Sequence, residues 1–203
     1  MANKDAAFGL RPLRRLDGSA WTGATQKMLV EDNYGTALFV GDPVIITGAA
    51  GSDDGTGHFN VASIATTGDG NRIAGVIVSV DPDPDALGRI YIPANTGGYI
   101  NVCTDPFVVF AVQDNAGATL TSASVGANAV IVGGAGSTIT GLSGWELAAA
   151  TTPAADASYQ LQIIGIVNSP NNIMGDNVIW EVIISNHLYL GGSAVANEGA
   201  LGI

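Results

Sequence analysis

The chain has 203 residues, a formal net charge of −11 at pH 7, 47% apolar residues and only 12% charged residues. Proteins usually carry roughly 25% charged residues, so small uncharged side chains must cover much of this surface, which suits burial against neighbouring subunits. The negative charge argues against nucleic acid as a partner of the body, because phosphate binding needs clustered Lys and Arg. Cys103 is the only cysteine, which excludes an intramolecular disulfide and a cysteine-based metal cluster.

The basic residues are concentrated at the N-terminus. The first 27 residues hold five of the seven, against two carboxylates, for a net charge of +3, whereas the remaining 176 residues have two basic residues against sixteen carboxylates, a net −14. The five are Lys4, Arg11, Arg14, Arg15 and Lys27. A basic segment on an acidic body marks the N-terminus as the first candidate for function.

Residues 1–25 show neither helical nor strand periodicity for long, and glycine and proline punctuate them. Pro12 also biases the residue before it towards extended geometry. We therefore predict an extended N-terminal arm, with apolar anchors at Phe8, Leu10, Leu13, Leu16 and Trp21. The alternative is that the segment packs back on the chain's own body as an edge strand.

Short apolar and β-branched runs separated by turn residues follow from residue 26 to residue 188. Strands are predicted at 27–31, 37–40, 44–47, 59–64, 73–80, 89–92, 99–102, 107–112, 159–167 and 178–185. The run 73–80 reads as a strand buried on both faces, and 107–112 is the best candidate for the core. This spacing predicts an all-β protein, an antiparallel β-sandwich or barrel with extended N- and C-terminal arms.

Three stretches are less regular. Residues 115–144 are low in complexity and fit either thin strands or long loops. Ser143 and Glu146 have the spacing of a capping box, which predicts a short helix over 147–150. Residues 189–203 are rich in glycine and alanine and are predicted as a C-terminal arm beyond the β-rich body 26–188.

Two glycine-rich stretches resemble catalytic or cofactor motifs but fail at a defined position. The sequence Gly-Ala-Gly at 134–136 invites a dinucleotide-binding interpretation, but Ile139 stands where the third glycine belongs. Residues 141–145 resemble a nucleophile elbow, but Trp145 occupies the closing glycine position. We therefore expect no cofactor and no catalytic site, so the protein is not predicted to be an enzyme.

Metal-ligand patterns fail in the same way. Asp81, Asp83 and Asp85 match the first three positions of a calcium loop, but Ala86 and Ile92 replace its glycine and glutamate. The alternative of an incidental divalent-ion site stays open. His58 and His187 have no partner at ligand spacing and are expected to be structural.

No membrane or export segment is expected. The longest apolar runs are much shorter than the roughly 20 residues that cross a bilayer. Arginines interrupt the N-terminal region where a signal peptide would be apolar. The sequence therefore predicts a protein made and folded in a cytoplasm.

The opening residues 2–12, ANKDAAFGLRP, resemble the start of the cement, or decoration, proteins of tailed phages, as described in cyanophages. The likeness continues in order at 39–44 (FVGDPV), 75–78 (GVIV) and 105–107 (DPF), and at Phe110 with Gln113. The resemblance implies a β-rich homotrimer on the outside of an icosahedral head, where it bridges major capsid proteins. It also implies a virion protein assembled in the host bacterial cytoplasm, with neither nucleic acid nor membrane as a partner.

In that setting the N-terminal segment is the predicted capsid-binding element. Its apolar side chains would hold the contact, and its basic side chains would orient it, because exposed ion pairs contribute only about 0.2–1 kcal/mol each. The predicted contact residues are Phe8, Leu10, Arg11, Pro12, Leu13, Arg14, Arg15, Leu16, Trp21 and Lys27. The alternatives are a phage tail or spike component, a β-rich carbohydrate-binding adhesion module, or an all-β hydrolase or lyase.

Overall fold

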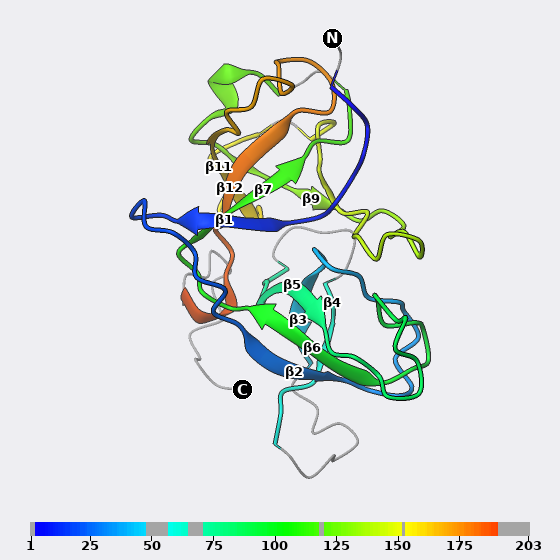
Figure 1. The fold of residues 1–203 in the computed structure, drawn as a ribbon. Helices are drawn as coiled ribbons and strands as arrows, with labels where there is room; N and C mark the ends of the chain where they lie inside the picture. Colours follow the sequence, from blue (N-terminus) through cyan, green and yellow to red (C-terminus); the bar gives the residue numbers. More distant parts are fainter. Residues whose placement is uncertain (1–2, 48–56, 65–70, 118–119, 152, 191–203) are drawn as a thin grey trace.

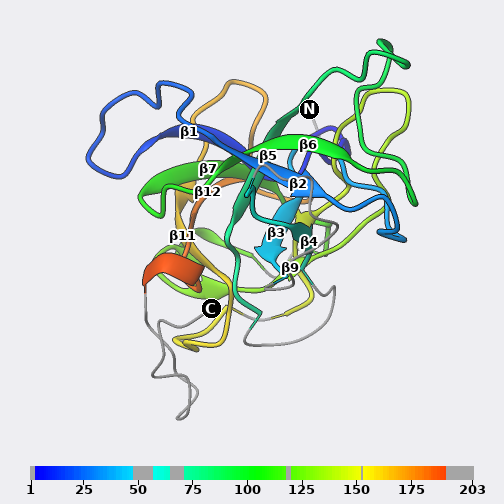
Figure 2. The ribbon, with the colours of Figure 1, turned by 90° about the horizontal axis from the view of Figure 1, so that it is seen from below.

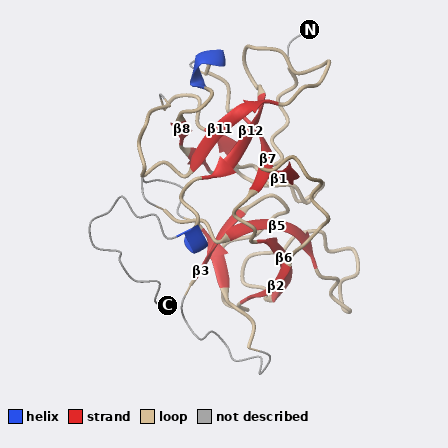
Figure 3. Cartoon of the chain, turned by 90° about the vertical axis from the view of Figure 1, so that its left-hand side faces the viewer, coloured by secondary structure: helices blue, strands red, loops and turns tan. Residues whose placement is uncertain are grey.

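The computed structural model describes residues 3–47, 57–64, 71–117, 120–151 and 153–190. Strands and loops make up almost all of this part of the chain, with two short 3₁₀ turns (Figure 3). Two antiparallel sheets of five strands and one of two strands form the architecture. The predicted all-β antiparallel class is confirmed.

The first sheet has the order β1-β7-β12-β11-β8. Its strands are β1 (Arg11–Arg15), β7 (Val108–Gln113), β12 (Ile179–Ile184), β11 (Leu161–Ile166) and β8 (Asn128–Ala129). Every residue of β7 is buried, because the strand pairs with β1 on one side and β12 on the other and lies under side chains on both faces. This strand is the centre of the first sheet.

The second sheet has the order β2-β6-β5-β3-β4 and lies below the first in Figure 1. Its strands are β2 (Gln26–Val30), β6 (Gly98–Cys103), β5 (Gly75–Val80), β3 (Pro43–Ile46) and β4 (Val61–Ser63). The remaining elements are β9 (Ile131–Val132) paired with β10 (Glu146–Leu147), and the 3₁₀ turns η1 (Ser122–Ser124) and η2 (Leu188–Leu190).

Two apolar clusters form the core. The larger one joins the sheets, because it contains Val76 and Cys103 of the second sheet together with Phe110 and Trp180 of the first. The smaller one lies within the second sheet and includes Met28. Viewed from below, β1 lies beside β5 and β7, so the first strand lies near the junction of the two sheets (Figure 2).

Most predicted strands occur within one or two residues of their expected bounds. The runs 37–40 and 89–92 do not form strands; they meet through the isolated bridge Leu38–Ile92. The run 73–80 is buried over its first half only, since Ser79 is exposed. The core prediction for 107–112 is confirmed for β7, but Phe107 itself is 49% exposed.

The helix predicted over 147–150 is wrong. The Ser143 hydroxyl accepts a hydrogen bond from Trp145 N–H at 3.0 Å, two residues on, so it does not cap a helix. Glu146 and Leu147 then pair with β9 as strand β10. Burial of Trp145 and Leu147 in the larger cluster outweighs the local capping pattern. The preceding stretch 115–144 contains thin strands and a 3₁₀ turn.

The N-terminal segment is part of the body in this structure. Arg11–Arg15 form the edge strand β1, which pairs antiparallel with β7, so the alternative of an edge strand holds for these residues. Pro12 is tolerated there because an edge strand leaves one side without ladder partners. At the other end, residues 189–190 belong to η2, and the rest of the predicted C-terminal arm lies outside the described residues.

Asp114, at the end of β7, supports the core through its side chain. It is 2% exposed and accepts hydrogen bonds from Trp180 Nε1–H at 2.9 Å and Val178 N–H at 3.2 Å. Asp114→Ala leaves these buried donors without an acceptor and should lower the free energy of unfolding by about 1–3 kcal/mol. Denaturant unfolding followed by tryptophan fluorescence measures this.

The matched control is Asp85→Ala, because Asp85 is an exposed aspartate in a loop. It should change stability by less than about 0.5 kcal/mol. Equal stability of the two variants would contradict the role assigned to Asp114.

Candidate functional site

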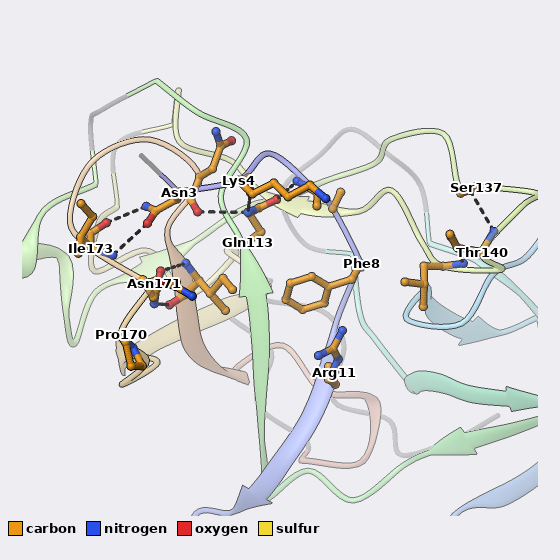
Figure 4. Close-up of a pocket in the computed structure, with 16 residues that line it drawn as sticks. Asn3, Lys4, Phe8, Arg11, Gln113, Ser137, Thr140, Pro170, Asn171 and Ile173 are labelled. Atoms are coloured by element: carbon orange, nitrogen blue, oxygen red, sulfur yellow. Dashed lines mark hydrogen bonds between the residues drawn. The ribbon is translucent and has the colours of Figure 1, made fainter. Parts of the chain in front are cut away.

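Residues 3–10 are fastened to the body by two amide side chains. Asn3 donates to the carbonyl oxygens of Ile173 and Asp176 at 2.7 and 2.8 Å and accepts from Ile173 N–H at 3.0 Å. Gln113, at the end of β7, donates to the Lys4 carbonyl at 2.8 Å and accepts from Ala6 N–H at 2.9 Å. Figure 4 shows both clamps at one end of the segment. The segment therefore has a defined path before β1 begins.

The same segment crosses the loop before β3 at very short range. Leu10 N–H donates to the Gly41 carbonyl at 2.9 Å. Gly9 has a φ of +71°, and a Cβ atom there would overlap the Gly41 carbonyl oxygen and lie 2.5 Å from Ser143 Cβ. Gly41 has a φ of +99°, and a Cβ on it would overlap the Phe8 carbonyl oxygen. Both segments therefore need glycine where they cross, Gly9 in one and Gly41 in the other.

A buried carboxylate lies beside this crossing. Asp42 is 3% exposed and accepts a hydrogen bond from Phe39 N–H at 2.8 Å. Burial raises the pKa of Asp42 to about 6, although hydrogen bonds from Ser143 and Phe39 act in the opposite direction. The charge on this aspartate therefore changes in a mildly acidic range.

Most of the predicted basic contact residues form ion pairs within the chain. Arg14 lies 2.7 Å from Glu181, and Arg15 lies 2.8 Å from Asp105. The hydrogen bond between Lys27 and Asp81, at 2.6 Å, raises the pKa of the lysine and lowers that of the aspartate. These pairs are partly exposed to water, which screens their attraction, so they orient the segment more than they stabilise it.

The apolar residues of the predicted binding element divide into two groups. Leu10 is 1% exposed and belongs to the larger core cluster, and Trp21 packs against that cluster. Leu13 and Leu16 are 37% and 43% exposed. Phe8 and Pro12 are half-buried. Fewer apolar side chains of this segment are therefore exposed for a partner than the sequence predicted.

Leu16 meets a second exposed apolar side chain at the end of β1. Its N–H donates to the Phe107 carbonyl at 2.7 Å, and Phe107 is 49% exposed. The two side chains line a shallow hollow of about 430 Å³ together with Arg15 and Asp17. We call Leu16 and Phe107 the edge patch.

A larger cleft of about 860 Å³ lies beside residues 3–11. The N-terminal segment contributes Lys4, Phe8 and Arg11 to it, and the loops 137–142 and 170–177 supply further lining (Figure 4). The Arg11 guanidinium stacks on the Phe8 ring, with its carbon atom 4.4 Å from the ring centroid. Of the predicted residues, only Phe8 and Arg11 line this cleft.

The aspartates of the 81–85 turn are engaged with other partners. Asp81 pairs with Lys27 and accepts from Asn101 at 2.7 Å. Asp83 pairs with Arg89 at 2.8 Å and accepts from Asp85 N–H. Within the described ranges, no three His, Cys, Asp or Glu side chains are grouped as metal ligands would be.

Two side chains with the chemistry of a nucleophile or base, Cys103 and His187, are inside the protein. Cys103 is fully buried, and burial raises the pKa of its thiol. His187 is 3% exposed, its Nδ1 accepts from Tyr189 N–H at 3.1 Å, and burial lowers its pKa to about 4. The thiol is therefore protonated and the imidazole neutral near pH 7.

Asn3, Gln113 and the loop 170–177 anchor the segment, and none of them was predicted as a site residue. The available signals were a glutamine ending an apolar strand and the cluster of asparagines in SPNNIMGDN at 169–177. Asparagines in such a stretch are typical of a turn, in which they bond to local backbone. Their partners are distant in sequence, so spacing alone could not connect them.

The chain matches no protein-family model, no curated protein and no solved structure. Among the described residues, no helix has the length and apolar character needed to span a bilayer.

Gly9→Ala tests the crossing, with Gly18→Ala as the matched control. Both glycines have positive φ, +71° and +86°, so alanine costs about 1–2 kcal/mol at either position. Only at Gly9 does the added methyl group overlap other atoms, since nothing lies within 4 Å of the Gly18 position. Gly9→Ala should therefore be clearly less stable in denaturant unfolding and more readily cleaved by protease within residues 3–16. Equal behaviour of the two variants would rule out a tight crossing.

Asp42 predicts a pH-dependent contribution to stability. Its folded pKa of about 6 lies above the ordinary 3.8, so its contribution is most favourable below pH 3.8 and is lost as the pH rises through 6. The stability of Asp42→Asn relative to the native chain should rise by roughly 1–3 kcal/mol between pH 4 and pH 7. Thermal or urea unfolding across this range measures the difference.

His187→Asn provides the control with the opposite sign. The folded pKa of His187, about 4, lies below the ordinary 6.5, so its contribution is present above pH 6.5 and is lost as the pH falls through 4. The stability of this variant relative to the native chain should rise on acidification. Two difference curves of the same sign would contradict the assignment.

Proposed function

We propose that the chain is a structural virion protein, a cement or decoration protein on the outer surface of a tailed-phage head. It acts as a homotrimer and stabilises the head by bridging major capsid proteins. We propose no catalytic role for it.

One observation carries the proposal: the segments with the phage-protein resemblance, far apart in sequence, contact one another. Gln113 binds the backbone of Lys4 and Ala6, and Leu10 N–H donates to Gly41 in the segment 39–44. Gly41 N–H in turn donates to the Ile77 carbonyl at 2.8 Å in the segment 75–78. The resemblance therefore falls on a single connected structural unit.

This unit reaches the surface at the edge patch. The segment 105–107 pairs with β1 through the ion pair between Arg15 and Asp105 and through the backbone of Leu16. The edge patch leaves two large apolar side chains about half exposed. Because each is already about half buried, covering the rest against a partner would contribute about 0.7–1.5 kcal/mol.

Such a contact is weak for one chain, since association itself costs at least roughly 4 kcal/mol. Three linked copies would gain by effective concentration, which is the physical reason for proposing a trimer. The low charge content of the chain also suits a surface shared with neighbouring subunits.

Leu16→Ser and Phe107→Ser test the proposal with purified heads that lack the protein. Each change removes one apolar group from every copy in the trimer, three in all, and should weaken head binding at least tenfold, because about 1.4 kcal/mol corresponds to a factor of ten. Co-sedimentation with heads measures the binding.

The matched control is Leu87→Ser, since Leu87 is 78% exposed and lies outside the edge patch. It should bind heads like the native chain. No head binding by the native protein would contradict the proposal, and selective binding on a glycan array would favour the carbohydrate-binding adhesion module. The mass of the native protein in solution tests the trimer directly.

A further inference from the structure

Two cationic side chains line the large cleft beside residues 3–11, and no carboxylate of the described residues pairs with them. Arg14, Arg15, Lys27 and Arg89 each lie within 2.8 Å of a carboxylate. Lys4 and Arg11, which line the cleft, have no carboxylate within 4.0 Å in the part of the chain that the structure describes. Both are exposed, and the protein as a whole has a net charge of −11. This local excess of positive charge therefore stands out on an acidic molecule.

Arg11 is held in a position suited to binding an anion. Its guanidinium carbon lies over the Phe8 ring, 4.4 Å from the ring centroid, and this cation–π contact holds the group beside the cleft. A planar guanidinium pairs with a carboxylate through two parallel hydrogen bonds. In Figure 4, Phe8 and Arg11 lie on the N-terminal segment across the cleft from Pro170 and Asn171.

Three of the five amide side chains that line the cleft are committed to the backbone. Asn3 and Gln113 hold the N-terminal segment. Asn172 donates to the carbonyl oxygens of Val167 and Ile179, at 2.9 and 2.7 Å, and accepts from Ile179 N–H. The cleft is therefore preformed, and besides its two cations it presents apolar surface from Phe8, Ile173 and Ile179.

We infer that this cleft binds an extended peptide segment that carries one or two carboxylates among apolar residues. The carboxylates pair with Arg11 and Lys4, and the apolar side chains lie against Phe8 and Ile173. This inference rests on the proposed function only for the identity of the partner, the major capsid protein; the binding chemistry follows from the cleft itself.

Two other ligand classes fit less well. A sugar would need an open aromatic face beside its amide partners, but Arg11 covers a face of Phe8. Three of the five amide side chains at the cleft, those of Asn3, Gln113 and Asn172, are already satisfied. A long polyanion such as nucleic acid would extend beyond the cleft over an acidic body. At physiological salt, charges interact over roughly 8 Å. One or two carboxylates on a short segment can both lie within that distance of the two cations.

The test uses the full chain and a set of blocked octapeptides of alanine and leucine that contain no glutamate, one glutamate or two. Fluorescence anisotropy measures binding at two salt concentrations. At least one peptide with glutamate should bind at least tenfold more tightly than its glutamine counterpart, and high salt should weaken it.

The variants Arg11→Gln and Lys4→Gln should each weaken this binding at least fivefold. Arg11→Lys should restore it only in part, because lysine keeps the charge but lacks the paired donors. The matched control is Arg89→Gln, which removes the same charge from an ion pair with Asp83 outside the cleft and should leave peptide binding within twofold.

Several results would overturn the inference: no glutamate peptide binding below millimolar concentration, equal binding of the glutamine peptides, or binding unaffected in both cleft variants. Tighter binding of a uronate oligosaccharide or an oligonucleotide would also overturn it. Head binding separates the two proposals. If the native chain binds heads but no peptide, the proposed function stands and the peptide-binding inference is wrong. If it binds the peptide but no heads, the peptide-binding inference stands and the proposed function is wrong.

Discussion

Two adjacent polar side chains at the end of strand β7 determine how the separate parts of this molecule meet. Gln113 holds the backbone at residues 4, 6 and 177, and Asp114 holds the indole of Trp180 and the backbone of Val178. Both are almost fully buried, so each needs all of its partners, because a buried polar group without one costs more than a single hydrogen bond contributes. The N-terminal segment, the loop before β12 and the central strand are therefore fixed together.

Ion pairs within the fold account for most of the basic residues concentrated at the N-terminus. Three of the five N-terminal cations neutralise carboxylates of distant segments, at Glu181, Asp105 and Asp81. They orient β1 and β2 on an acidic body. The two that remain, Lys4 and Arg11, lie at the cleft, so the structure separates cations that stabilise the fold from cations available to a ligand.

Strand positions could be predicted because alternating and β-branched runs report local burial, which the sheets then satisfy. The helix after Ser143 could not be excluded, since its local pattern was sound and only the distant packing of Trp145 and Leu147 overrode it. In the candidate site, Phe8 and Arg11 were found from composition. Asn3 and Gln113 could not be predicted, because each bonds to a residue more than 100 positions away. The local sequence around either residue does not indicate its distant partner.

The clamp between Ala6 and Gln113 joins residues 107 positions apart, and the strand β1 depends on the same distant partner. A ribosome therefore releases the N-terminal segment long before β7 and the loop at 170–177 exist to receive it. Contacts of such high sequence separation form late and slowly in folding. Until they form, Leu10 is exposed together with Leu13 and Leu16. The newly made chain therefore has an aggregation-prone N-terminal segment, and Leu10 is buried only when synthesis is nearly finished.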